Sequence, residues 1–307
     1  MRIHRTSRAA LPDGTRSRLT DHYGPEINGW LDEAQELVAD LARDWNLTVL
    51  GFHDAGWTSV IAVCQKAGQK CVLKLTPDAR RFERERAALA HWRDKSVCQL
   101  LRVDPVWGAL LLQAVGGTPG GTPRPEDHAR RVAATLPELH AHPALPDAAV
   151  PLFAAHQSAV VRPRIQDRLR RLAHGLDDEL VEAVHAVDME RMSSRGSLVM
   201  LHADLYAENI PFDSHGQPVF IDPHPMRGPA AYDWAFWCVY YTVDGFERRL
   251  DLCGGVAAVP MDEVVAHAAV LALDGYLYYL DTKDPRAGSI REALHVAVHH
   301  ALAGARR

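Results

Sequence analysis

The clearest chemical signal in the sequence is a group of oxygen-bearing and imidazole side chains within one short stretch. An apolar run, 198–201, ends at His202 and Asp204, and Asn209 follows five residues after the aspartate. An aspartate can accept the proton of a hydroxyl group, whereas an amide oxygen and a second carboxylate, here Asp222, are ligands that Mg²⁺ prefers. Two such ligands suffice, because phosphate oxygens and water complete the coordination shell. The stretch therefore predicts transfer of a phosphoryl group to a hydroxyl.

A β-hairpin is expected to bring the two metal ligands together. Segments 209–213 and 218–221 flank 214–217, a short polar turn that carries a glycine, and this is the pattern of two strands joined by a tight turn. The first residue of one strand and Asp222, just past the other, would then be neighbours. Taken singly, such residues have more ordinary roles in turns, caps and cores. Their combination around one hairpin is what favours a catalytic site.

Lys74 is a second candidate, because a lysine inside the apolar strand 70–75 is costly to bury without an anion. The helix predicted over 78–92 offers such an anion. Glu85 falls on the apolar stripe of that helix, whereas Glu83 points elsewhere. We expect Glu85 to hold Lys74 against the α- and β-phosphates of a nucleotide. The alternative is a lysine on a strand edge whose charged end reaches solvent.

The turn 54–59 joins two strands expected between 47 and 64 and could cover the phosphates. Its residues Gly56, Thr58 and Ser59 would let backbone N–H groups approach them, since glycine has no Cβ in the way. Alone, the turn is an ordinary hairpin. Its position just before the candidate lysine favours a nucleotide-binding role.

A buried strand over 108–113 runs into the glycine-rich segment 114–121. We expect the backbone from Gln113 to Val115 to lie beside the adenine ring of a nucleotide, which would form hydrogen bonds with N–H and C=O groups there. The same stretch can also be interpreted as a flexible linker.

The motif His-x-Asp-x-x-x-x-Asn, from His202 to Asn209, and the Ile-Asp-Pro at 221–223 resemble the catalytic segment of the aminoglycoside phosphotransferase family. Within that family, the motif most resembles the streptomycin and hydroxyurea kinase branch. The usual form in the family is HGDLHxxNIL, so Ala203 stands where glycine is common and Tyr206 where a second histidine is common. Neither departure removes a catalytic oxygen.

The resemblance implies an α+β, two-lobe, protein-kinase-like fold. Residues 26–115 would form a small lobe with an antiparallel sheet, and 116–307 a larger, mainly helical lobe with the catalytic hairpin and the acceptor pocket. Residues 1–25 show no periodicity and are expected to be a poorly ordered arm or one draped over the lobe. In the large lobe, helical patterns occur near 126–141, 164–174 and 177–192.

The resemblance also assigns roles to the candidate residues. Asp204 would orient the acceptor hydroxyl and take its proton, while His202 would brace the loop. Asn209 and Asp222 would hold Mg²⁺ against ATP or GTP. Asp233 would open a helix and tie the catalytic loop together.

Composition limits the remaining possibilities. The chain has 307 residues and a net charge of −5, which disfavours a nucleic-acid partner and permits a cationic substrate. No apolar run is long enough to span a bilayer, and the basic start lacks an apolar segment, so we expect a cytoplasmic protein. The five cysteines are scattered, which argues against a zinc site or a disulfide framework.

The sequence supports one hypothesis with two alternatives. The hypothesis is O-phosphorylation of a small, cationic antibiotic by ATP or GTP, which would confer resistance. The alternatives are a metabolic kinase for an amino alcohol, sugar or sugar amine, and a nucleotide-binding pseudokinase. Acidic residues of the C-terminal helices could bind ammonium groups or simply lie on solvated faces; they are Asp251, Asp262, Glu263, Asp274, Asp281 and Asp284.

Overall fold

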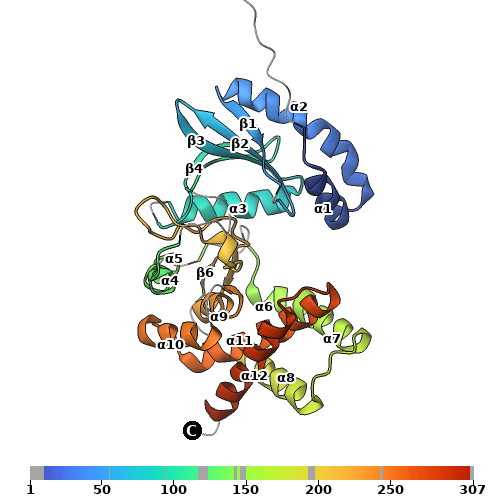
Figure 1. The fold of residues 1–307 in the computed structure, drawn as a ribbon, viewed down its shortest axis with the longest axis vertical. Helices are drawn as coiled ribbons and strands as arrows, with labels where there is room; N and C mark the ends of the chain where they lie inside the picture. The colour runs from blue at the N-terminus through green and yellow to red at the C-terminus, as the bar shows by residue number, and fades with distance from the viewer. Residues whose placement is uncertain are drawn as a thin grey trace, which may run out of the picture. The chain divides into compact units, whose positions relative to one another are not determined.

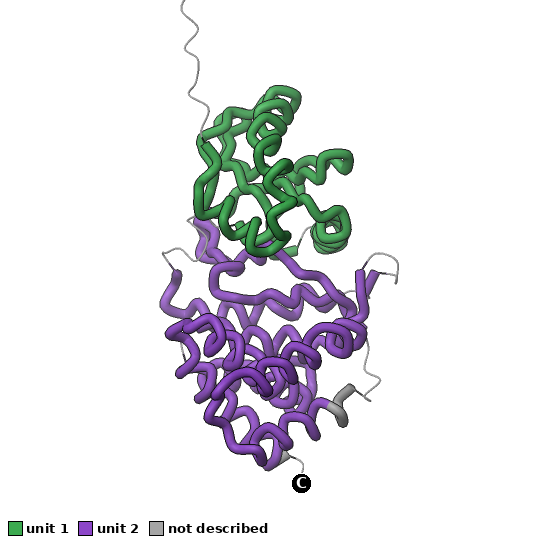
Figure 2. The backbone as a smooth tube through the Cα atoms, turned by 90° about the vertical axis from the view of Figure 1, so that its right-hand side faces the viewer, with its two compact units in different colours: residues 1–115 green, residues 116–307 purple. Residues whose placement is uncertain are grey.

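The computed structural model describes residues 10–54, 56–93, 95–116, 124–141, 144–145, 150–192, 198–242 and 245–304. The chain divides into two compact units, residues 1–115 and 116–307 (Figure 2).

Unit 1 is built on an antiparallel sheet, as the resemblance implied. Its five strands lie in the order β1-β2-β3-β5-β4, and every neighbouring pair is antiparallel. The strands are β1 (Thr48–Phe52), β2 (Val60–Lys66), β3 (Gln69–Leu75), β4 (Leu100–Asp104) and β5 (Ala109–Gln113). The order places the β1–β2 turn, the end of β3 and the β4–β5 turn at one end of the sheet.

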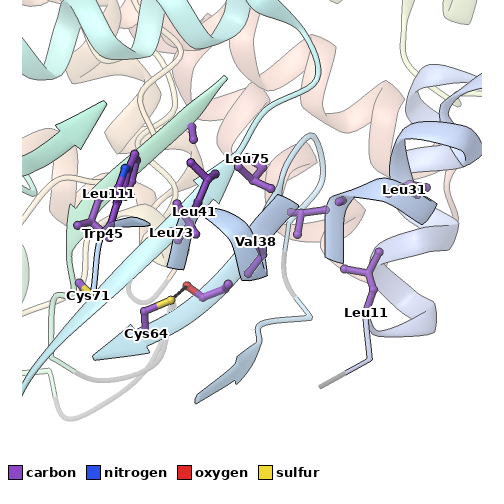
Figure 3. Close-up of a cluster of buried hydrophobic side chains, with 14 of the residues drawn as sticks. Leu11, Leu31, Val38, Leu41, Trp45, Cys64, Cys71, Leu73, Leu75 and Leu111 are labelled. Carbon is purple, nitrogen blue, oxygen red and sulfur yellow. Dashed lines mark hydrogen bonds between the residues drawn. The ribbon is translucent and has the colours of Figure 1, made fainter. Parts of the chain in front are cut away.

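Besides the sheet, unit 1 contains the helices α2 and α3 (Figure 1). Helix α2 (Asn28–Asp44) buries Leu31 and Leu41 in the same apolar cluster as Leu73 of β3, a cluster shown in Figure 3. Helix α3 (Ala79–His91) begins at Asp78, whose side chain accepts hydrogen bonds from the N–H groups of the first turn. Such a cap satisfies donors that a helix start leaves unpaired.

The expectation of a poorly ordered arm is wrong for α1 (Asp13–Tyr23). This helix contributes Leu19 to the core, and Leu11 just before it is buried there too. Its second buried residue is Thr15, a polar side chain that forms a hydrogen bond instead of apolar contacts. One leucine within eleven residues gives no apolar periodicity, which is why the pattern escaped detection.

Unit 2 is mainly helical, in agreement with the fold that the resemblance implied. The predicted helix near 126–141 is broken at Leu136, before Pro137, because proline opens a new helix more readily than it continues one. The helices are α4 (His128–Thr135), α5 (Pro137–His140), α6 (Phe153–His156), α7 (Arg162–Arg171), α8 (Asp178–Met192), α9 (Ala230–Tyr240), α10 (Phe246–Val256), α11 (Met261–Asp281) and α12 (Ala287–Gly304). A short antiparallel pair, β6 (Val199–Leu201) and β7 (Met226–Gly228), precedes and follows the catalytic segment.

Helix α11 is the centre of the unit 2 core. It packs against α7, α8, α9 and α12 and buries most of its residues (Figure 1). None of the described helices, α11 included, has the length and apolar character needed to cross a membrane.

Ion pairs join α7 to α11 and decide the role of two of the acidic residues considered above. Asp274 is 5% exposed and binds Arg164 and Arg168, with Arg168 Nη1 3.1 Å from Asp274 Oδ1. Asp281 lies about two turns further along α11. Its Oδ2 is 2.8 Å from Arg171 Nη2. Because arginines already neutralise both carboxylates, neither is available to an ammonium group in this structure.

The ion pairs predict unequal stabilities for two matched variants. Asp274→Ala should lower the free energy of unfolding by about 2–3 kcal/mol, because it leaves two guanidinium groups without their buried partner. Asp281→Ala should change it little, since that pair is exposed to solvent. Urea unfolding of the two variants and the unchanged protein measures both effects. Equal losses would show that burial of Asp274 does not set the energy of this pair.

Candidate active site

Within unit 1, Lys74 and Glu85 form a buried ion pair. Lys74 Nζ lies 2.7 Å from both carboxylate oxygens of Glu85, and the two residues are 4% and 1% exposed. Glu83, by contrast, is exposed and pairs with Arg86 on the same helix. The end of β3 and one face of α3 therefore supply a fixed ammonium group, and its position does not depend on a bound anion.

The turn at 54–59 is shaped by Gly56 and by two buried hydroxyl residues. A Cβ on Gly56 would lie 2.0 Å from the carbonyl oxygen of Ser59, so only glycine allows this close backbone approach. Ser59 is 1% exposed, and its Oγ lies 3.0 Å from Oγ1 of Thr76. Thr58 is 8% exposed. With both hydroxyl residues buried, the backbone is the part of this turn best able to meet a phosphate.

Gln113 and Val115 lie at the end of β5 and just beyond it. The N–H of Gln113 is bonded to the carbonyl of Gln99, and its side chain is exposed. Val115 is the last residue of unit 1.

Within unit 2, one buried carboxylate organises the start of the catalytic loop. Asp233, at the first turn of α9, accepts hydrogen bonds from the backbone N–H groups of His202 and Ala203, each at 2.8 Å. Nε2 of His140 lies 2.9 Å from the same carboxylate. Asp233 and His202 are both 0% exposed. The chain leaving β6 is thus held to α9 and α5 immediately before Asp204.

The side chain of His202 is neutral rather than charged. Complete burial lowers the pKa of its imidazole to about 4, and the nearby carboxylates of Asp233 and Asp222 only partly oppose this. The ring is therefore uncharged at neutral pH. Its backbone carbonyl accepts from the N–H of His224, which joins the two ends of the catalytic segment.

Asn209, where the hairpin begins, contacts Asp204 on the loop before it. Asn209 Nδ2 donates to the backbone oxygen of Asp204 at 2.9 Å and to its Oδ2 at 2.8 Å. The hairpin itself is present: the N–H of Ile221 bonds to the carbonyl of Asn209, and that of Val219 to the carbonyl of Pro211. The two arms form no regular strands and share one isolated bridge, between Phe212 and Pro218, but the bond from Ile221 to Asn209 places Asp222 next to Asn209.

The donor set at this hairpin fits a magnesium ion. Both oxygens of Asp204 can only accept, so the amide nitrogen of Asn209 must face them and its Oδ1 is the atom left to meet a cation. With the carboxylate of Asp222, this gives two oxygen ligands of the kind that Mg²⁺ takes in nucleotide sites. The described part of the chain contains no group of three or more His, Cys, Asp or Glu side chains able to hold a metal.

Two residues of the site have left-handed backbone conformations. Ala203 has a φ of 57° and Asp222 a φ of 54°. Aspartate tolerates this region better than most residues, whereas alanine does so at a cost of about 1 kcal/mol relative to glycine.

Two contributors to the site were missed by sequence reasoning. His140 supports Asp233, as described above. Arg124 donates to the backbone oxygens of Ala207 at 2.7 Å and Ile210 at 3.3 Å, and so holds the loop between the catalytic residues. Neither has a local signal: one ends a helix and the other follows the glycine-rich segment 114–121.

Tyr206 connects the catalytic loop to the helical core. Its ring lies 5.2 Å from that of Phe236 and 4.9 Å from that of Tyr240, and the hydroxyl of Tyr240 donates to the backbone oxygen of Leu271 on α11. Burial raises the pKa of Tyr206 well above the ordinary value, so its hydroxyl stays protonated. An aromatic group thus extends from Asp204 toward α9 and α11.

A buried lysine–glutamate pair on an antiparallel sheet, and an aspartate held beside an asparagine and a second aspartate on a hairpin, together define a kinase-like phosphotransferase. The chain belongs to the aminoglycoside/hydroxyurea antibiotic resistance kinase family, which matches residues 45–246, more than half of its length. It is 25% identical to a streptomycin 6-kinase of Streptomyces glaucescens over 241 residues, which covers 73% of this chain and 72% of the relative.

Solved structures support the fold. A ternary complex of the aminoglycoside phosphotransferase APH(4)-Ia with ADP and hygromycin B is similar with a TM-score of 0.63 and 15% identity, covering 85% of this chain and 97% of the other. A choline kinase of Streptococcus pneumoniae is similar with a TM-score of 0.59 and 12% identity, covering 88% and 99%. At such identities the likeness shows the fold alone. Family membership makes the chain a small-molecule kinase with a nucleotide as phosphoryl donor.

The left-handed conformation of Ala203 predicts opposite effects for the same substitution at two alanines of the loop. Ala203→Gly should keep or raise the melting temperature, because glycine adopts a positive φ without strain. Ala207→Gly should lower the free energy of unfolding by about 0.5–1 kcal/mol, because Ala207 lies in a helical turn. Thermal unfolding of both variants measures this. A loss at Ala203 as large as that at Ala207 would contradict the argument.

Proposed function

We propose that this kinase transfers the γ-phosphoryl group of ATP or GTP to a hydroxyl of a small, cationic antibiotic and so confers resistance. The observation that carries the proposal is the contact of Asn209 with Asp204 on the hairpin that ends at Asp222. It unites a proton acceptor with two oxygen ligands for a metal. A cytoplasmic location, where nucleotide and Mg²⁺ are abundant, goes with this chemistry.

The proposed reaction needs positioning more than covalent chemistry. The acceptor oxygen attacks the γ-phosphorus, the bond from that phosphorus to the β–γ bridging oxygen breaks, and the nucleoside diphosphate leaves. The acceptor proton passes to the carboxylate of Asp204. Asn209 fixes the direction of that carboxylate through the 2.8 Å hydrogen bond to Oδ2. A proton acceptor that is already oriented spares the reaction the entropy of aligning it.

The charge on the phosphates would be met by two sets of side chains. Asn209 and Asp222 would hold Mg²⁺, which neutralises charge on the β- and γ-oxygens when bound. Lys74 would hold the α- and β-phosphates. Glu85 keeps the lysine ammonium in place through hydrogen bonds to both of its carboxylate oxygens.

A cationic acceptor fits three features of the chain. Its net charge is −5. The ring of Tyr206, partly exposed and packed on the buried rings of Phe236 and Tyr240, lies two residues from Asp204, and ring faces attract ammonium and guanidinium groups. The curated relative phosphorylates streptomycin, by its name, and a fold neighbour is bound to hygromycin B.

A metabolic kinase for an amino alcohol is the second candidate. The fold likeness to a choline kinase favours it, since that enzyme shares the whole length of the fold. The two candidates use the same residues for phosphoryl transfer and differ only in the acceptor.

Product analysis distinguishes them. The purified protein with Mg²⁺ and ATP or GTP is incubated with hydroxylated antibiotics and, in parallel, with choline and sugar amines. A mass gain of one phosphoryl group on an antibiotic supports the proposal, whereas a gain on choline or a sugar amine alone would replace it with the second candidate. No nucleotide consumption with any acceptor would contradict both.

Asp204→Asn should separate chemistry from binding. We expect kcat to fall about 10²–10³-fold, because an amide cannot take the hydroxyl proton, while the Kd for the magnesium nucleotide stays nearly unchanged. Asp213→Asn is the matched control: it lies in the same hairpin, and its Oδ1 caps the turn, a task that an amide oxygen can also perform. Full turnover by Asp204→Asn would remove this residue from its role.

Glu85→Gln should impair nucleotide use. Without the carboxylate, Lys74 loses its fixed position, and kcat/KM for the nucleotide should fall about tenfold or more. Glu83→Gln, on the same helix but exposed, should leave kcat/KM unchanged. Steady-state kinetics of both variants, with melting temperatures to show that each is folded, measure this. Equal kinetics in the two variants would make the Lys74–Glu85 pair purely structural.

A further inference from the structure

Helix α1 contacts the β1–β2 turn at its beginning, its middle and its end. At the beginning, Asp54 Oδ1 accepts from Thr15 Oγ1 at 3.0 Å and from Arg18 Nη2 at 2.5 Å. In the middle, Arg18 Nε donates to the backbone oxygen of Gly56 at 3.3 Å. At the end, the hydroxyl of Tyr23, the last residue of α1, donates to the backbone oxygen of Thr58 at 2.9 Å.

These contacts are anchored in the core of unit 1. Thr15 and Leu19 are both 0% exposed, and Leu19 belongs to the cluster that also contains residues of α2 and β3. The Arg18 side chain is 22% exposed, so most of it is fixed against the protein. A helix seated in this way gives the turn a rigid support.

The contacts also settle the charge of the turn. Hydrogen bonds from Arg18 and Thr15 hold the pKa of the Asp54 carboxyl below its usual range, so the group is ionised. An ionised carboxylate beside nucleotide phosphates would repel them. The guanidinium of Arg18 balances that charge within the turn.

We propose that α1 is a positioning element of the nucleotide site, in which Arg18 fixes the turn 54–59 and cancels the charge of Asp54 so that phosphates can approach. The proposal rests on the proposed nucleotide-dependent reaction, and it adds a segment outside the stretch that matches the family, which begins at residue 45. Arg18 acts through the turn and is a positioning residue, not a catalytic one.

A purely structural role for α1 makes a different prediction. Suppose that this segment only completed the core through Leu11 and Leu19. Loss of either partly exposed arginine of α1 would then affect stability and nucleotide binding alike. Arg16 provides the comparison: it lies on the same helix and pairs at 2.9 Å with a carboxylate, Asp32, but it does not contact the turn.

The test compares Arg18→Gln with Arg16→Gln in the full chain. Binding of Mg–ATP and Mg–GTP is measured by calorimetry without an acceptor, and melting temperatures report folding. We expect the Kd of Arg18→Gln to rise about tenfold, the effect of losing one charged hydrogen-bonding group, and that of Arg16→Gln to match the unchanged protein. If an active acceptor is in hand, the nucleotide KM should rise while the acceptor KM does not.

A second variant isolates the charge. In Arg18→Gln/Asp54→Asn the unbalanced carboxylate is gone, so the Kd should return most of the way to that of the unchanged protein. A role in core packing alone gives no reason for such recovery, because the second change restores no apolar contact.

The outcomes separate this inference from the proposed function. If the unchanged protein binds nucleotide and the two single variants bind equally well or equally poorly, the inference is overturned and the proposed function stands. Failure of the double variant to recover also overturns the charge argument. If the unchanged protein binds no nucleotide, both are overturned.

Discussion

The buried carboxylate of Asp233 is the constraint on which the catalytic loop depends. A carboxylate with 0% exposure is costly unless donors surround it, and here two backbone N–H groups and the ring of His140 do so. Two of these donors belong to His202 and Ala203. The carboxylate therefore fixes the backbone immediately before Asp204, including the left-handed turn at Ala203, whose strain the two hydrogen bonds offset. Asp204 follows directly on a segment that these hydrogen bonds hold to α9 and α5.

Other charged groups are likewise held in fixed orientations by neighbouring side chains, without a bound substrate. Lys74 is held by Glu85, and the carboxylate of Asp204 by Asn209. Arg124 fixes the carbonyls between Asp204 and the hairpin. Phosphoryl transfer gains little from covalent participation and much from fixed charges that need no reorganisation. A fold in which buried ion pairs and hydrogen bonds orient the charged groups is suited to that requirement.

How far the sequence predicted the site follows from the distance along the chain between partners. The hairpin and the Lys74–Glu85 pair depend on neighbours within about a dozen residues, so turn chemistry and helical periodicity were sufficient. His140 and Asp233 are 93 positions apart, and Arg18 and Asp54 are 36 apart. No local pattern encodes such pairs. The sequence left the roles of Asp274 and Asp281 open for the same reason: only the fold shows that arginines of α7 neutralise them.

The two departures from the usual family motif have different physical consequences. Ala203 changes only the backbone energy of a loop whose geometry Asp233 already imposes. Tyr206 changes what surrounds Asp204, because its ring packs against those of Phe236 and Tyr240. A histidine there would offer a smaller ring that titrates near neutral pH, whereas the tyrosine is uncharged. The residues proposed for phosphoryl transfer are thus retained while the surroundings of Asp204 differ from the usual motif, so the motif alone does not define the acceptor of this kinase.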